Sequence, residues 1–319
     1  MSYEFLEIVN GKHKYKVTLN VYRDCKNSSV EFDDEIKLGV YIGSNPSPLN
    51  QTAVFTLTTK FNVEPPGSID CDYYRKNVCI EYGFYEGFIE LSPSVSGYHL
   101  TFARCCRNSQ NNIVQGGDGP TQGQTYYCYI PNTDLQNSSA QFYGVPSPFM
   151  CVNDTNSFLF DAVDKDGDSL VYRIMRPYQG GGTGNFFPDP PANLDTPLIR
   201  YKPGYSSGFP FGSTGYAKVD ASTGHTLLYS TATGNFVVGV EVREYRNGVL
   251  ISKVRMDLQI LVLDCIPNDV PDISSDKGKR FIIEEGEELC FTVSASDPDG
   301  DLVKLRGRGA LLGDAGGID

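Results

Sequence analysis

The chain has 319 residues, of which 40% are hydrophobic, so it is long enough for two or three domains and apolar enough to bury a core. Its net charge of −12 argues against a nucleic-acid partner, which requires a basic surface, but suits carboxylates that bind hard cations. No apolar run approaches the roughly 20 residues that cross a bilayer, so no membrane span is expected.

The two ends indicate a piece of a longer protein. The opening Met-Ser-Tyr-Glu-Phe lacks the basic stretch and apolar run of a secretory signal. The chain is therefore either cytoplasmic or a fragment without its signal. The last residues, 311–319, fall in the middle of a predicted new domain, which favours the fragment.

Apolar and polar residues alternate through most of the chain, as in half-buried strands. Tyr15, Val17, Leu19 and Val21 alternate with polar neighbours. Similar runs cover residues 36–42, 54–63, 78–91, 98–106, 125–130 and 169–175. The 33 glycines and 19 prolines suit a chain with many turns. We therefore predict an all-β protein of tandem Ig-like or cadherin-like β-sandwich domains.

A β-hairpin is predicted over residues 235–264, with Asn247-Gly248 at its turn. A two-residue loop would pair Val242 with Lys253 and place an apolar face opposite a polar one. A three-residue loop pairs Val240 with Val254 and keeps the apolar faces together. We therefore predict a turn of residues 246–248, with Gly248 left-handed in a bulge.

Two segments of the chain repeat. Residues 158–168 align with residues 291–301, and both end in an Asp-x-Asp-Gly-Asp sequence. The repeat predicts an N-terminal β domain over 1–144, a cadherin-like sandwich over 145–265, a Pro-rich linker over 266–274, and a truncated further repeat over 275–319.

The repeated acidic loops are candidate metal sites. Each places three carboxylates at alternate positions, and the linker adds Asp269. Such closely spaced anions repel one another unless a cation lies among them, and Ca²⁺ accepts six to eight oxygens in flexible geometry. The sequence does not fit an EF-hand, and an ion-free, solvated turn is the alternative. The predicted calcium ligands are Asp164, Asp166, Asp168, Asp297, Asp299, Asp301 and Asp269.

The nine cysteines include no Cys-x-x-Cys pair, so disulfides are favoured over zinc. We expect Cys71 to pair with Cys79. Cys105 and Cys106 are expected to point to opposite faces of a strand and to have different partners, one of which is Cys25. Cys128 is expected to pair with Cys151. Disulfides require an oxidising compartment.

An enzyme is not expected. Gly204-Tyr-Ser206-Ser-Gly208 matches a hydrolase G-x-S-x-G sequence, but the flanking prolines leave no room for the helix that this motif requires. His13 and His99 are expected to be ordinary half-exposed strand residues. The 20 tyrosines and 18 phenylalanines are assigned to core packing rather than to a binding surface.

Several segments resemble one family. The segments are Tyr15 to Cys25, Arg104-Cys-Cys-Arg-Asn108, Asn111-Asn-Ile113, Asp164 to Tyr172, Pro203-Gly-Tyr205 and the hairpin around Glu244 to Gly248. In this order, over residues 1 to about 265, they resemble a region of very large secreted Bacteroidetes surface proteins. Residues 220–236 are similar to cadherin-like and dystroglycan-type modules.

The resemblance implies type IX secretion, a place on the outer cell surface, and a role in adhesion or gliding motility. We therefore expect a non-catalytic module that binds a cell-envelope protein, a surface or a polysaccharide, with calcium stiffening its joints. One alternative is an accessory glycan-binding module of a polysaccharide-degrading enzyme. A weaker alternative is an esterase that uses Ser206.

Overall fold

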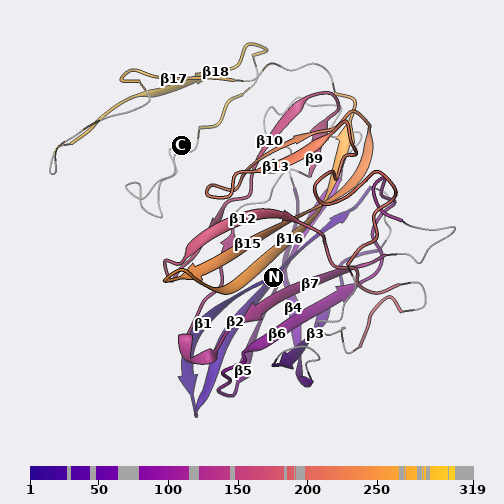
Figure 1. Ribbon diagram of the computed structural model, residues 1–319, viewed down its shortest axis with the longest axis vertical. Coiled ribbons are helices and arrows are strands. Elements are labelled where there is room, and N and C mark those ends of the chain that lie inside the picture. Colours follow the sequence, from indigo (N-terminus) through magenta and orange to yellow (C-terminus); the bar gives the residue numbers. More distant parts are fainter. Residues whose placement is uncertain are drawn as a thin grey trace. The chain divides into compact units, whose positions relative to one another are not determined.

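The structure is a computed structural model, and the chain in it divides into two compact units (Figure 1). It describes residues 1–26, 30–43, 48–63, 79–114, 122–143, 148–182, 185–189, 191, 198–265, 269, 271–278, 282, 284, 288–300 and 302–305. Unit 1 comprises Met1–Val63 and Cys79–Asp264, and unit 2 comprises Glu64–Val78 and Cys265–Asp319.

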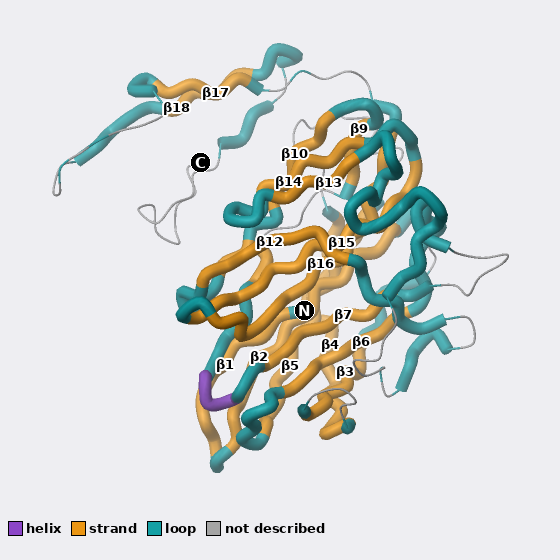
Figure 2. The backbone as a smooth tube through the Cα atoms, in the orientation of Figure 1, coloured by secondary structure: helices purple, strands orange, loops and turns teal. Residues whose placement is uncertain are grey.

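Strands make up nearly all of the regular structure, and one short 3-10 turn, η1 (Thr133–Leu135), is the helical element of the described residues (Figure 2). The all-β prediction is confirmed. Within the described residues no helix has the length and apolar character needed to cross a membrane. The strands of unit 1 are β1 (Ser2–Val9), β2 (Lys12–Asp24), β3 (Glu35–Ile42), β4 (Leu49–Asn62), β5 (Ile80–Leu91), β6 (Tyr98–Arg104), β7 (Gln124–Ile130), β8 (Gln141–Phe142), β9 (Phe149–Cys151), β10 (Thr155–Leu159), β11 (Ala162–Val163), β12 (Ser169–Met175), β13 (Tyr216–Val219), β14 (His225–Tyr229), β15 (Gly234–Arg246) and β16 (Val249–Leu263).

One curled sheet organises unit 1. Its strands run in the order β1-β2-β5-β4-β3-β6-β7-β16-β15-β12, and β9 pairs with β16 in parallel. β1 lies against β7, and the Tyr3 hydroxyl donates to Ser252 on β16. Two smaller sheets, β10-β14-β13 and β11-β8, complete the unit. The domain boundary predicted at residues 144 and 145 falls inside this unit, since β7 and β16 pair across it.

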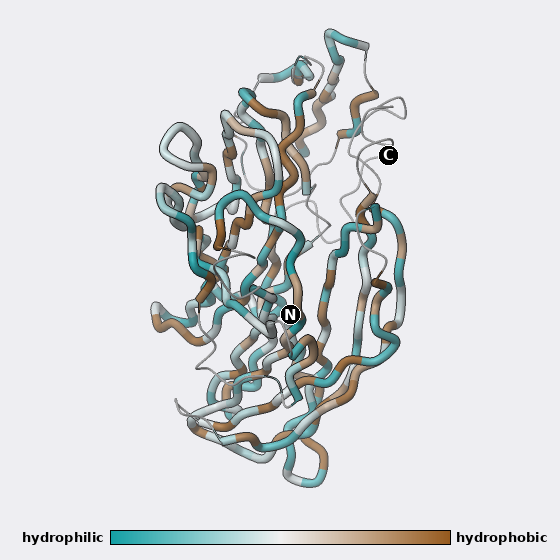
Figure 3. Tube along the Cα trace, turned by 90° about the vertical axis from the view of Figure 1, so that its right-hand side faces the viewer, coloured by the Kyte–Doolittle hydropathy of each residue, from teal (hydrophilic) through white to brown (hydrophobic). Residues whose placement is uncertain are grey.

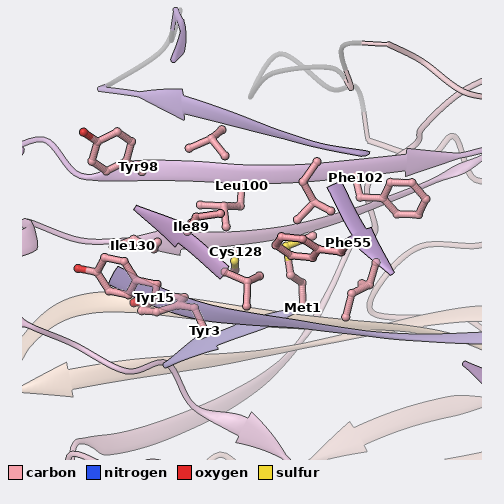
Figure 4. Packing of buried hydrophobic residues seen from close by; sticks show 14 of the residues in the cluster. Met1, Tyr3, Tyr15, Phe55, Ile89, Tyr98, Leu100, Phe102, Cys128 and Ile130 are labelled. Atoms are coloured by element: carbon pink, nitrogen blue, oxygen red, sulfur yellow. The ribbon is translucent and has the colours of Figure 1, made fainter. Parts of the chain in front are cut away.

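The sheet encloses two main apolar cores. The first contains Tyr3, Tyr15, Phe55, Cys128 and neighbouring side chains, all facing the same interior (Figure 4). The second is built largely from the β15–β16 hairpin and includes Phe236, Leu228 and Ile260. Along the strands, apolar and polar residues alternate, as the sequence pattern predicts (Figure 3). The buried tyrosines confirm that much of the aromatic content is core.

The β15–β16 register differs from the prediction. The loop has two residues, Asn247 and Gly248, between the paired Arg246 and Val249. Both loop residues have positive φ, 52° and 79°, so Gly248 is left-handed as expected. A bulge between Glu244 and Tyr245 then shifts the register, and Val242 pairs with Val254. The apolar faces therefore still meet, but the extra residue is in β16 and not in the turn.

In unit 2 the described regular structure is a two-stranded sheet. β17 (Asp272–Ser275) pairs antiparallel with β18 (Val293–Ser296). The second acidic loop follows β18 directly. The linker predicted over 266–274 lies in this unit, and four of its residues, 266–268 and 270, are outside the described residues.

Candidate functional sites

The first acidic loop connects β11 to β12 and is held by its own backbone. Asp164 Oδ1 accepts the N–H groups of Asp166 at 3.0 Å and Asp168 at 2.9 Å. Gly167, at φ 81°, supplies the left-handed step of this turn. One carboxylate oxygen from each of the three aspartates lies within 4.8 Å of the others. The structure therefore brings together the first three predicted ligands.

Arg246, at the end of β15, neutralises part of this loop. Its Nε donates to Asp168 Oδ1 at 2.8 Å, and its Nη2 donates to Asp168 Oδ2 at 2.7 Å. The same Nη2 lies 3.3 Å from Asp166 Oδ2. Arg246 was not predicted from the sequence, because nothing in the local pattern shows that the end of the hairpin reaches the loop.

One oxygen of the loop has no hydrogen-bond partner. Asp164 Oδ2 is buried and unpaired. Burial raises the pKa of Asp164, and the charges of Asp168 and Asp166 raise it further, while N–H donors from the loop oppose these effects. A divalent ion would satisfy this oxygen, but Asp168 is already bound by Arg246 through both of its oxygens. The loop therefore fits calcium only in part, because a bound ion must either share the Asp168 carboxylate with Arg246 or displace Arg246 from it.

A buried glutamate lies behind the loop. Glu244 is 0% exposed, and its carboxylate accepts the Ala140 N–H at 2.9 Å and the Asn137 amide at 3.1 Å. Burial raises the pKa of Glu244 to about 7, and the charges of Asp164 and Asp168 contribute to the rise. The negative charge of the loop thus acts on a titratable group in the core.

The acidic loop of unit 2 has the same local conformation. Asp297 Oδ1 accepts the Asp299 N–H at 2.9 Å, and Gly300 has φ 82°, close to the value at Gly167. The Asp269 N–H donates to Asp299 Oδ2 at 2.5 Å, so the linker contacts this loop through its backbone. Asp301 lies outside the described residues.

All three predicted disulfide pairings are wrong. Cys25 bonds to Cys79, because the β2–β5 ladder ends at the pair Asp24 and Ile80 and places the next residues side by side. Cys105 bonds to Cys106, since β6 ends at Arg104 and the two residues no longer alternate across a strand.

The remaining cysteines are divided between bonded and free. Cys128 is free and buried in the first core, so it is not paired with Cys151. Cys151 and Cys265 are disulfide-bonded, and Cys290 is free and exposed. Cys71, the expected partner of Cys79, lies outside the described residues.

A groove of about 650 Å³ lies beside the Cys105–Cys106 disulfide. Its aromatic lining includes Phe187, which is 54% exposed and lies 3.6 Å beneath the Arg104 guanidinium. The charges in its wall are paired, with Arg104 Nε 3.1 Å from Asp33 and Arg23 Nη2 2.9 Å from Glu31. A volume of this size is typical of a small-molecule site.

The residues of the esterase alternative are not assembled. Ser206 Oγ accepts the Phe209 N–H at 3.1 Å within its own loop. The His225 imidazole instead hydrogen-bonds to Ser157 at 2.7 Å. His13 and His99 are 4% and 8% exposed, so the prediction of half-exposed histidines is wrong. His99 is held between Tyr127 and the Gly43 carbonyl.

Comparisons of this chain with protein-family models, curated proteins and solved structures gave no match.

Proposed function

We propose that this chain is a non-catalytic module of a large secreted cell-surface protein concerned with adhesion or gliding motility. The observation that carries the proposal is the oxidation of six described cysteines in an all-β scaffold: Cys25, Cys79, Cys105, Cys106, Cys151 and Cys265. Disulfides persist in oxidising compartments outside the cytosol, and they stabilise chains that must remain folded in those compartments. The finer proposal is that its β units are Ig-like or cadherin-like repeats.

The partner in this proposal is a cell-envelope protein, a surface or a polysaccharide, and export uses type IX secretion. An antibody raised against the chain tests this on unpermeabilised cells of the source organism. Labelling of intact cells is expected. Labelling that appears only after permeabilisation contradicts the surface location.

Calcium in the acidic loops is the second part of the proposal. The unpaired Asp164 Oδ2 and the shared turn geometry of the two loops support it. Calcium at 100 times its dissociation constant would stabilise the fold by about 2.7 kcal/mol. Thermal unfolding with calcium and with EGTA should therefore differ. Identical melting temperatures remove calcium from the account.

A second candidate function is glycan binding in the groove beside Cys105 and Cys106. Exposed aromatic faces suit the C–H faces of sugar rings, and the paired charges favour a neutral ligand over an ion. Tyr22 also lines the groove, and its hydroxyl is buried without a hydrogen-bond partner.

Calorimetric titration with xylan and dextran oligosaccharides tests this second function. Replacing Phe187 with alanine should abolish the heat of binding. Phe209, an exposed phenylalanine that does not line the groove, provides the matched control F209A. Equal binding by F187A and the unmodified chain contradicts the assignment.

A further inference from the structure

A cluster of positive charge lies on one face of the β12–β15–β16 sheet. The register places Arg173, Glu241 and Arg255 in one row across the three strands. Arg243 and Lys253 form the adjacent pair, two residues along and on the same face. We call Arg173, Arg243, Lys253 and Arg255 the basic cluster.

All three arginines converge on one buried carboxylate. Glu241 is 0% exposed, and its Oε1 accepts Arg173 Nε at 2.7 Å and Arg243 Nε at 2.9 Å. Its Oε2 accepts Arg255 Nε at 2.8 Å. Burial by itself raises the pKa of Glu241, but the surrounding positive charges outweigh burial and hold that pKa below its ordinary value. Glu241 therefore remains an anion that fixes the guanidinium groups in place.

One carboxylate does not balance this cluster. Four cations against one anion leave three formal positive charges on a chain whose net charge is −12. Burial and the charge of Arg255 lower the pKa of Lys253. Asp257, two residues along β16 from Arg255, does not offset the excess, because Arg107 donates to its carboxylate at 3.0 Å. Like charges so close together favour binding of an additional anion.

A guanidinium nitrogen of the cluster is unused. Arg255 Nη1 is buried and has no hydrogen-bond partner, while its guanidinium lies 4.2 Å from the Tyr178 ring centre. The Arg173 and Arg243 side chains are 46% and 29% exposed, so the cluster is open to solvent. An incoming oxyanion would meet the exposed Arg173 and Arg243 guanidinium groups, which Glu241 already fixes in place.

We infer that the basic cluster binds the carboxylate or sulfate groups of an acidic polysaccharide. The backbones of Arg173 and Arg255 are two strand spacings apart, about 10 Å, but their guanidinium groups meet at Glu241. The excess of three positive charges is therefore concentrated in one patch, and several anionic groups of one polymer balance it better than a single small ion. Tyr129, which hydrogen-bonds to Ser96 and lies in the next strand, β7, offers a partly exposed ring for a sugar. A role for this binding at the cell surface rests on the proposed function, whereas the binding itself is inferred from the basic cluster alone.

Binding of the full chain to immobilised heparin, alginate and dextran tests the inference. Heparin carries sulfates, alginate carries carboxylates, and dextran is neutral. The double variant R173Q/R243Q should bind heparin or alginate at least tenfold more weakly than the unmodified chain. Dextran affinity, which reports on the neutral-glycan groove, should not change. Raised salt should weaken the charge-dependent binding.

The matched control is K14Q/K16Q, which also removes two cations. Lys14 and Lys16 are on β2, and each pairs with one glutamate. This control should bind acidic polysaccharides within twofold of the unmodified chain. Equal losses in both double variants, or no binding of heparin and alginate, overturn the inference.

Footprinting of the unmodified protein provides a second readout that does not require a variant to fold. Heparin or alginate should protect Arg173 and Arg243 from phenylglyoxal. Protection by inorganic sulfate alone, with none from either polymer, overturns the polysaccharide assignment. The absence of polysaccharide binding would not bear on the surface location, which antibody labelling of intact cells tests separately.

Discussion

Replacing Glu244 with glutamine should change how the stability of unit 1 depends on pH. The folded state raises the pKa of Glu244 from 4.5 to about 7, with burial as the main cause. The folded protein therefore holds this proton more tightly than the unfolded chain. The associated stability is complete below the unfolded pKa of 4.5 and is lost as pH rises through about 7. The pKa difference corresponds to about 3 kcal/mol in full.

Urea unfolding at about pH 5 and about pH 8 measures this effect. Between about pH 5 and about pH 8 the free energy of unfolding of the unmodified chain should fall, relative to that of E244Q, by most of this contribution. The difference between the two proteins removes the contributions of other titrating groups. The E244Q side chain keeps one acceptor oxygen, but it presents an N–H₂ group where the second carboxylate oxygen was. One of the two donors, Ala140 or Asn137, therefore loses its acceptor. Parallel pH profiles for the two proteins would contradict a raised pKa of Glu244 in the folded state.

Two further predictions concern Arg246 and His99. Replacing Arg246 with glutamine removes both hydrogen bonds to Asp168, whose side chain is 4% exposed, and should destabilise the chain by about 2–4 kcal/mol, seen in urea unfolding; a loss below about 0.5 kcal/mol contradicts the pairing. Burial lowers the pKa of His99 to about 4, with the charge of Lys253 adding to the effect, so its imidazole should stay neutral down to about pH 5 in NMR titration. A midpoint near its ordinary 6.5 would be inconsistent with the buried site. Stability linked to His99 is present above 6.5 and is lost as pH falls through about 4.

The sequence could predict strands and turns but not all pairings between them. Alternation identified β2 and β12 because each has one face on a core and one toward polar surroundings. The β15–β16 register required knowing where a bulge forms, and the extra residue lies in β16, between the partners of Glu244 and Tyr245. The hydrophobic pattern determined which faces of the two strands meet, but it did not locate the extra residue in β16.

The acidic loop shows the same limit. Asp164 to Asp168 could be identified from spacing alone, because the oxygens are close in sequence. Arg246 could not, since its position depends on the β15–β12 pairing across 78 residues. Disulfides failed for a related reason: Cys25 and Cys79 meet through the β2–β5 ladder, which no local spacing reveals.

Disulfide mapping of the unreduced chain, purified from an oxidising compartment, is the decisive test of a secreted, disulfide-braced scaffold. Alkylation before and after unfolding, followed by peptide mass spectrometry, identifies each bonded pair. We expect a Cys25–Cys79 cross-link, unmodified Cys105 and Cys106, and a Cys128 thiol that reacts only on unfolding. Alkylation of Cys25 and Cys79 without a reductant would contradict a disulfide-braced extracellular scaffold.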